Sequence, residues 1–467
     1  MRAFVLSILL CLSSIVSAQD STSIMSLSEY LGYVKSFHPI VKQANLIINK
    51  SEAKLMKARG AFDPKLEVDY NRKKFKNTEY YDRLNASFKI PTWFGVELKG
   101  NFEENTGDFL NPQAFIPEDG LYSAGVSVAV ARGLLTNSRM AMLRQSRLYV
   151  KQAQVDRQLL VNNILYNATV TYFNWLKTYN EKRVYEAFLT NAKMRFSGIK
   201  KSFEVGDKPA IDTLEARIAL NNRKLNLEKS RIKFIKSSLE LSNYLWLNAN
   251  TPIEIQDLVI PDANTFNTID LTLNTSGLDI ESFDIENHPK LQSLDYKFQS
   301  LNIEKRLKLN NLLPQIDLEY NFLSQTPEVA RSFSTSAYKS GVNMSFPLFL
   351  RKERGDLKLA KIKLQDTKFE IQNTRLGLKN KINAISQELD SYIIQNDYTD
   401  IIVNDYSKML SAEERKFFLG ESSLFLVNSR ESKLIDAKLK AIDIENSFFK
   451  TKAKLFNVLA LSEIQMN

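Results

Sequence analysis

Cysteine, histidine, glycine and proline are all scarce in this sequence. Its 467 residues contain one cysteine, two histidines, 15 glycines and 12 prolines. So few cysteines and histidines exclude a disulfide framework and a Cys/His metal centre, and they leave little from which to build a thiol catalyst. We therefore expect no metal site and no cofactor. The scarcity of glycine and proline argues against a loop-rich all-β protein and favours long, uninterrupted helices.

Charged residues are numerous but evenly mixed. Lys and Arg number 63 and Asp and Glu 53, which gives a formal net charge of +10. Because basic residues are interspersed with acidic ones, the charge indicates a dispersed, solvated surface and not a nucleic-acid interface. Phosphate-binding glycine loops, Gly-x-Ser-x-Gly elbows and His-Glu-x-x-His motifs are missing from the sequence. We expect no enzyme, no catalytic residues and no nucleic-acid partner.

The first 18 residues have the features of a secretory signal peptide. A positive start at Arg2 is followed by the apolar run 3–16 and by small residues up to Ala18, which fit a cleavage site. The only cysteine, Cys11, lies within the apolar run, and we expect it to be removed with the signal peptide. We expect an exported mature chain without cysteine. No later stretch is apolar enough for a transmembrane helix, so insertion into a membrane would require strands.

An internal duplication organises the rest of the chain. Four short stretches recur in the same order, the first two 250 positions apart and the others 216 and 214 positions apart. Half one therefore holds about 34 additional residues. Such ordered recurrence indicates a tandem structural repeat. The matching pairs are His38-Pro39 with His288-Pro289, 62–71 with 312–321, 122–128 with 338–344, and 203–206 with 417–420.

Each half has the pattern of a helix, strands, a long helix, a sharp turn and a second helix. We expect the first repeat to span 19–247 and the second 287–467, with 248–286 as an irregular linker or equatorial segment. The turns are predicted where a glycine precedes helix-starting residues. The predicted elements are strands at about 64–132 and 314–348, helical hairpins at about 136–247 and 351–463, and tips at 203–209 and 417–423.

The predicted strands alternate between apolar and polar residues. Leu66, Val68 and Tyr70, for example, alternate with Glu67 and Asp69. A half-buried sheet in a soluble protein gives the same alternation. Export and aromatic residues near the strand ends favour the wall of a membrane β-barrel with its apolar face outward. These aromatic residues are Tyr80, Tyr81, Trp93, Phe94, Tyr122 and Tyr338.

The additional residues of half one predict an extra pair of strands on either side of 90–95. This pair either enlarges the barrel or stands apart as an extracellular hairpin, and we expect the hairpin. The following stretch, 106–120, contains two prolines and is expected to form an outer loop.

Apolar residues repeat every seven positions along the predicted long helices, which predicts coiled-coil packing. A helix at about 136–203 would be roughly 100 Å long at about 1.5 Å per residue, a length that suits a structure crossing a compartment. The two series are Val161, Leu165, Ala168, Tyr172, Trp175 and Tyr179, and Leu357, Ala360, Leu364, Thr367, Ile371, Thr374 and Leu378, continued by Ile382, Ile385, Leu389 and Tyr392.

This arrangement resembles the TolC family of outer-membrane channel proteins. The resemblance covers about 25–465 and rests mainly on the duplicated order of helix, strands and helix. Its motifs are Leu312-Leu313-Pro314 leading into a strand, 341–349 leading from a strand into a helix, and the two glycine-containing tips. It implies a mainly α fold with membrane β-strands: a homotrimer whose strands close one shared β-barrel and whose paired helices form a long coiled-coil periplasmic tunnel.

The resemblance further implies passive export through the cell outer membrane, with the helices extending into the periplasm. A periplasmic adaptor protein and an inner-membrane pump, either proton-driven or an ATP-driven ABC transporter, would deliver substrate for efflux or type I secretion. The tips match the regions where family members dock on adaptors. One such turn would indicate only a helix reversal, whereas two at equivalent positions favour docking. The predicted docking residues are Val205, Gly206, Asp207, Leu419, Gly420 and Glu421.

A periplasmic gate is expected just beyond the tips. Better-known family members carry acidic residues there, and rings of carboxylates at a constriction favour cations. Asp212 matches such a position in half one, but the equivalent positions in half two are Leu426 and Ser429. The acidic ring is therefore missing in half two. We expect a hydrophobic constriction formed by Leu424, Phe425 or Leu426 as its substitute.

An exported structural or adhesive coiled-coil protein without transport activity is the alternative function. It would account for the seven-residue period, but not for strands placed between helices twice at matched spacing. His38 and His288, each before a proline, indicate helix starts and not a catalytic pair.

Overall fold

The computed structural model describes residues 23–256, 258–277, 283–327 and 334–461. The chain divides into two compact units. The helical unit contains the described residues up to Ala44, Gln158–Ile285 and those from Gly377 onward, and the sheet unit contains Asn45–Arg157 and Glu286–Leu376. The predicted signal peptide lies outside the described residues.

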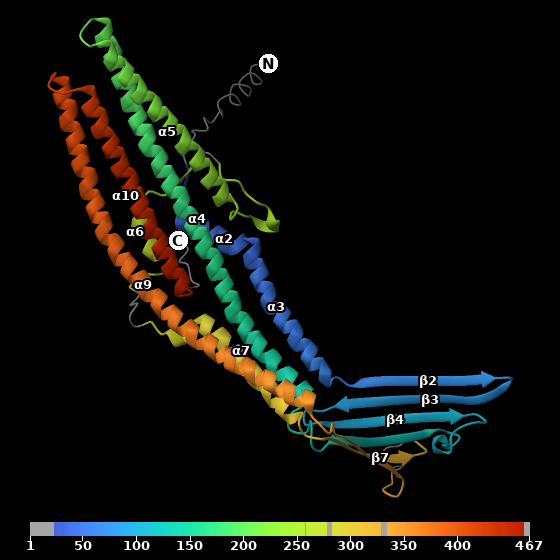
Figure 1. The fold of residues 1–467 in the computed structure, drawn as a ribbon. Coiled ribbons are helices and arrows are strands. Elements are labelled where there is room, and N and C mark those ends of the chain that lie inside the picture. The colour runs from blue at the N-terminus through green and yellow to red at the C-terminus, as the bar shows by residue number, and fades with distance from the viewer. Residues whose placement is uncertain (1–22, 257, 278–282, 328–333, 462–467) are drawn as a thin grey trace, which may run out of the picture. The chain divides into compact units, whose positions relative to one another are not determined.

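Long helices dominate the chain (Figure 1), so the predicted mainly helical fold with a sheet is confirmed. Among the described residues, no helix is both long enough and apolar enough to cross a membrane. The helices are α2 (Leu27–Phe37), α3 (Pro39–Arg59), α4 (Ser138–Glu204), α5 (Ala210–Ser242), α6 (Thr265–Thr272), α7 (Pro289–Asn310), α9 (Arg351–Phe418) and α10 (Leu424–Val458). Short strands β1 (Ser23–Met25) and β6 (Val259–Pro261) form a parallel pair.

The seven-residue series form packed faces of the long helices, as predicted. In α4, every member of the series from Val161 to Trp175 is buried. In α9, Ile382, Ile385 and Leu389 are buried as well, and they belong to the same core as the α4 residues. Burying one stripe of each helix is what stabilises such long elements, since helix propensity alone is weak.

The two His-Pro pairs begin helices, as predicted. His38 Nδ1 accepts a hydrogen bond of 3.2 Å from the backbone N–H of Ile40 in α3. His288 Nδ1 accepts one of 3.0 Å from the backbone N–H of Lys290 in α7. Both histidines are buried, and the proline that follows each of them needs no backbone donor in the first helical turn. The pairs therefore act as helix caps.

His38 should make the helical unit sensitive to acid. Its ring stacks on Tyr244 with the ring centroids 5.5 Å apart. Burial lowers the pKa of the imidazole below its ordinary 6.5, against an opposing hydrogen bond with the backbone of Asn243. The folded state thus favours neutral histidine, so its stabilisation is complete above about pH 6.5 and is lost as the pH falls through the folded-state pKa.

We expect the variant His38→Asn to lose less thermal stability on acidification than the wild type. Asparagine keeps a capping acceptor but does not titrate. Thermal unfolding followed by circular dichroism at about pH 7.5 and about pH 5 measures the difference. Equal losses in the two proteins would show that His38 does not contribute to the acid sensitivity.

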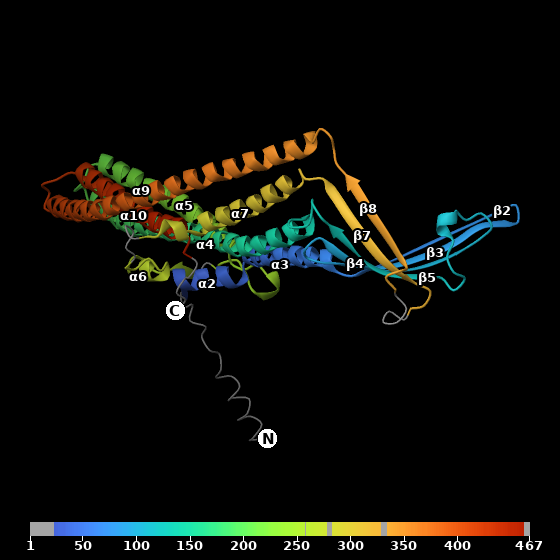
Figure 2. The same ribbon diagram turned by 90° about the horizontal axis from the view of Figure 1, so that it is seen from below.

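One antiparallel sheet of six strands forms the centre of the sheet unit, in the order β2-β3-β4-β5-β7-β8 (Figure 2). At one end of this sheet, here called the loop end, β2 turns into β3 through Lys76 and Asn77, whose positive φ angles suit a type I′ hairpin. At the other end, the helix end, the chain passes from β5 into α4 and from β8 into α9. The strands are β2 (Lys65–Phe75), β3 (Thr78–Pro91), β4 (Val96–Thr106), β5 (Leu121–Ala129), β7 (Gln315–Ser324) and β8 (Tyr338–Ser345).

The extra strand pair of half one, β3 and β4, is an integral part of this sheet. β3 pairs with β2 from Lys65↔Lys89 to Phe75↔Thr78, and β4 pairs with β5 along eight positions. The expectation of a separate extracellular hairpin is therefore wrong. The hydrogen bonds that a detached hairpin would leave open on its outer sides are made here with the neighbouring strands.

Candidate functional site

One face of the six-stranded sheet is mainly apolar, with the charged residues Arg72, Asp82 and Glu104 on it only near the loop end. A single row of paired residues, Val96, Val128, Leu318 and Val342, crosses four strands on this face. None of these side chains is buried, and Leu318 and Val342 are 40% and 73% exposed. An exposed apolar face of this extent requires a non-aqueous covering.

Aromatic residues lie at both ends of the strands. At the loop end, Tyr80 packs against Phe109 with ring centroids 4.8 Å apart. At the helix end, Trp93 stacks on Phe62 at 5.6 Å, and the neighbouring Phe94 is 60% exposed. Amphipathic rings at both limits of an apolar band are typical of proteins that cross a membrane as strands.

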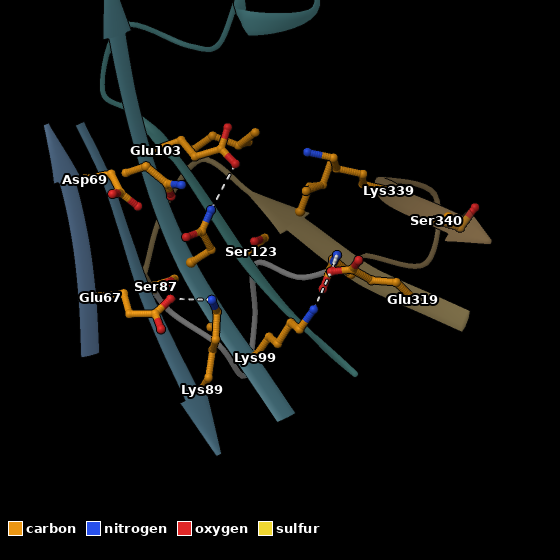
Figure 3. Close-up of a pocket in the computed structure, with 17 residues that line it drawn as sticks. Glu67, Asp69, Ser87, Lys89, Lys99, Glu103, Ser123, Glu319, Lys339 and Ser340 are labelled. Atoms are coloured by element: carbon orange, nitrogen blue, oxygen red, sulfur yellow. Dashed lines mark hydrogen bonds and ion pairs between the residues drawn. The ribbon is translucent and has the colours of Figure 1, made fainter. Parts of the chain in front are cut away.

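The opposite face of the sheet is polar and ion-paired. One row of paired residues on it crosses all six strands: Lys65, Lys89, Lys99, Gly125, Asn321 and Lys339. Carboxylates in the adjacent rows pair with two of these lysines, at 2.5 Å between Lys89 Nζ and Glu67 and at 3.2 Å between Lys99 Nζ and Glu319 (Figure 3). Such a face is stable next to water and not next to lipid.

The lack of a side chain at Gly125 of β5 leaves room for a polar side chain of β7 to lie over this strand. A Cβ atom at Gly125 would lie 2.1 Å from Asn321 Oδ1 and 2.3 Å from the carbonyl oxygen of Tyr320. Without a side chain at this position, Asn321 lies across β5 and donates a hydrogen bond of 3.2 Å to Glu319 Oε1. The polar face therefore continues without interruption from β5, in half one, to β7, in half two.

The two predicted tips have the same backbone structure. Gly206 and Gly420 adopt φ angles of 89° and 82° after the ends of α4 and α9. The residue after each glycine donates its N–H to a carbonyl five residues earlier, at 2.8 Å for Asp207 and 2.9 Å for Glu421. This is the Schellman arrangement that ends a helix with a left-handed glycine. The residues before the glycines, Val205 and Leu419, are 73% and 63% exposed.

The residues predicted for the gate are divided between packing and surface. Leu424 is 1% exposed and packs with Ile199 and Ala216. Phe425 and Leu426 are 66% and 40% exposed. Asp212 lies in the first turn of α5, where its charge is favourable to the helix dipole, and Ser429 is exposed. Among the predicted hydrophobic residues, Phe425 and Leu426 are thus the ones available to line a constriction.

A buried ion network that the sequence analysis did not identify joins the two hairpins near their tips. Glu431 of α10 is 1% exposed, and its carboxylate accepts from Arg195 of α4 at 2.6 Å. Arg223 of α5 lies 3.8 Å from the same carboxylate. Arg195 also pairs with Glu414 of α9 at 2.9 Å. One cluster therefore connects all four helices.

A sequence signal for this network exists. Glu431 stands in the apolar series Leu424, Val427 and Leu434 of α10, at the same spacing of three and four. Arg223 interrupts the corresponding series of α5 in the same way. A charged residue on a seven-residue stripe predicts a buried partner on a facing helix.

No protein-family model and no curated protein matches the chain. Solved structures do match it. CmeC, an outer-membrane channel of Campylobacter jejuni, is 15% identical, with a TM-score of 0.65 over 94% of this chain and 87% of CmeC. The outer-membrane protein VceC of Vibrio cholerae is 10% identical, with a TM-score of 0.66 over 93% and 96%. The open MtrE channel of Neisseria gonorrhoeae is 12% identical, with a TM-score of 0.64 over 96% and 94%. The chain has the fold of TolC-type outer-membrane channels.

This TolC-type fold extends over almost the whole chain, in agreement with the predicted resemblance. The matched proteins are an outer-membrane protein and outer-membrane channels. Among the described residues, no group of three or more His, Cys, Asp or Glu side chains is placed to hold a metal ion.

Proposed function

We propose that this chain forms a homotrimeric channel in the cell outer membrane and conducts substrates passively from the periplasm to the exterior. The sheet units of three copies would close one barrel in the membrane, and the helical units would extend into the periplasm as a tunnel. The observation that carries the proposal is the two-faced sheet, apolar on one side, ion-paired on the other and bordered by aromatic residues at both ends.

The two faces require two different solvents. Val342 and Leu66, at 73% and 71% exposure, favour contact with lipid hydrocarbon, at about 25 cal/mol per Å² of apolar surface removed from water. Lys89 and Glu67 on the other face require water, because an ion pair in hydrocarbon is costly. A barrel with lipid outside and water inside provides both. A structural or adhesive coiled-coil protein would have no use for such a sheet.

In this proposal the tips dock on a periplasmic adaptor, and an inner-membrane pump, proton-driven or of the ABC type, loads the channel. Equivalent Schellman turns, each with an exposed apolar residue before the glycine, support docking at Val205–Asp207 and Leu419–Glu421. The exposure of Phe425 and Leu426 supports a hydrophobic gate beside the tips, with Asp212 and Ser429 as its polar members. The efflux or secretion of a particular substrate would be determined by the pump.

Purified in detergent, the protein is expected to be a trimer that raises the conductance of a planar lipid bilayer in discrete steps. Mass determination corrected for bound detergent and single-channel recording measure the two properties. Heat-denatured protein in the same detergent is the control for detergent leakage. A protein that remains a monodisperse monomer without detergent, and that gives no conductance steps, would refute the proposed function.

A further inference from the structure

We propose that β8 of each copy pairs with β2 of the next copy in one defined register, Val342 opposite Val68, and so closes an 18-stranded barrel. The inference rests on the proposed trimeric channel. It adds the size of the barrel and the residues that meet at each subunit joint, where the partner is a second copy of this chain.

The sheet ends in two open edges, β2 and β8. On β8, the carbonyl oxygen of Ala337 accepts a hydrogen bond of 3.0 Å from Leu323 N–H, so the odd-numbered residues of β8 face β7. The even-numbered residues, Val342 among them, therefore present their N–H and C=O groups at the open edge. In hydrocarbon such groups must be paired, because there is no water to bond those left open.

The apolar residues at both edges lack a neighbour on one side. Leu66 and Val68 on β2 are 71% and 58% exposed, and Val342 and Met344 on β8 are 73% and 64% exposed. By comparison, Leu98, on an interior strand of the same face, is 47% exposed. A strand added at each edge, with apolar residues on the same face, would continue the band. β2 of a second copy is such a strand for the β8 edge, and β8 of a second copy is such a strand for the β2 edge.

The number of strands follows from the continuous sheet. Half one supplies four strands and half two supplies two, so three copies supply 18. Barrel diameter grows roughly in proportion to strand number, which makes this barrel about 1.5 times as wide as one built from two strands per half. With strands about 4.8 Å apart and tilted by about 36°, it measures roughly 34 Å across between backbones.

The usual tilt of barrel strands restricts the offset at the joint to about six to eight residues. A barrel whose shear equals its strand number has strands tilted by about 36°, within the usual range of about 35–45°. For 18 strands this means a shear of about 18 residues, shared as about six residues at each of three identical joints. The row from Lys65 to Lys339 crosses one copy without offset. Lys339 therefore lies opposite Asn71 of the next copy, six residues along β2 from Lys65.

This register pairs all eight residues of β8 and brings no like charges together. An offset of the same size in the opposite direction, toward the helix end, would place β8 opposite residues that precede the start of β2 at Lys65. No pairs between β8 and β2 would then form. The resulting pairs are Tyr338 with Arg72, Lys339 with Asn71, Ser340 with Tyr70, Gly341 with Asp69, Val342 with Val68, Asn343 with Glu67, Met344 with Leu66, and Ser345 with Lys65.

Neighbouring registers fit less well. Because side chains alternate between faces, only shifts by two residues keep apolar residues on one side. An offset of eight places Lys339 opposite Lys73, an unfavourable pair of like charges, at the point where the pairing of β2 with β3 shifts by one residue. An offset of four leaves two residues of β8 unpaired and reduces the strand tilt to about 26°, below the usual range.

Disulfide trapping tests this joint, because the only cysteine, Cys11, lies in the predicted signal peptide. We expect the double variant Glu67→Cys, Asn343→Cys to form covalent trimers on oxidation. Asn343 would sit in a non-hydrogen-bonded pair with Cα atoms about 4.5 Å apart, within disulfide range. The matched controls combine Asn343→Cys with Lys65→Cys or Asp69→Cys, which lie two residues to either side on the same face and about 7–8 Å away. A non-reducing denaturing gel should show covalent trimer for the first variant and monomer for both controls.

Any other result contradicts either the proposed pairing of β8 with β2 or its register. Covalent trimers in a control variant alone would show a different register. Absence of cross-links in all variants, while they still conduct as trimers, would refute pairing of β8 with β2 and leave the proposed function standing. If the first variant fails to assemble, Val68→Cys with Val342→Cys tests the same register on the apolar face. A wild type that forms neither trimers nor conductance steps would instead refute the proposed function itself.

Discussion

The variant Val126→Arg is expected to prevent most of the protein from assembling in the outer membrane. Val126 lies on the apolar face of β5, paired with Leu98 on one side and Tyr320 on the other. An arginine in the middle of a lipid-facing band costs about 2–4 kcal/mol in each copy. Three copies meet in one barrel, so the cost is multiplied in the trimer. The amount of trimer in outer-membrane fractions, run unheated on a denaturing gel, measures the loss.

The next residue along the same strand provides the control. Ser127 points to the polar face, between Glu97 and Glu319 in its row. An arginine there faces water and two carboxylates, so Ser127→Arg should assemble at nearly the wild-type level. Equal loss in the two variants would mean that both faces are packed inside protein. Equal tolerance would mean that the face of Val126 does not contact lipid.

The alternation that locates these strands also explains why their pairing could not be foreseen. Leu66, Val68 and Tyr70 reveal a two-faced strand because side chains follow a period of two. Strand pairing, in contrast, is made by backbone N–H and C=O groups, which are the same for a detached hairpin and for an inserted one. Only the register rows, such as the one through Lys89 and Lys99, distinguish the two arrangements.

The turns at the tips could be predicted from the sequence, whereas the partners in the ion network could not. The repeated glycines predict the turns directly, because Gly206 and Gly420 need a positive φ that other residues rarely adopt. Glu431 and Arg223 are single charges within apolar series, and most charges on helices are solvated. To recognise them as partners, one must know which helices face each other. The sequence of a single hairpin does not contain this information.

Removal of the Glu431 carboxylate is expected to cause the largest loss of stability in the helical unit. The side chain is 1% exposed, and it holds Arg195 at 2.6 Å while Arg223 lies 3.8 Å away. In Glu431→Ala, two arginines would remain near the protein interior without this counter-charge. Breaking a buried pair in this way costs about 3–5 kcal/mol, because the remaining charge keeps its desolvation penalty. Urea unfolding followed by circular dichroism measures the decrease.

Two further variants distinguish the effect of losing the buried charge from the effects of losing an exposed ion pair or the shape of the side chain. Glu414→Ala removes the other partner of Arg195, but that carboxylate is 44% exposed, so we expect a loss of at most about 1 kcal/mol. Glu431→Gln keeps the shape and a hydrogen-bond acceptor without the charge, and should fall between the two. If Glu431→Ala costs no more than Glu414→Ala, the network does not hold the hairpins together. If it costs several times more, the tips of the two hairpins are joined by a charge pair whose loss would let them separate, since Glu431 belongs to one hairpin and both arginines to the other.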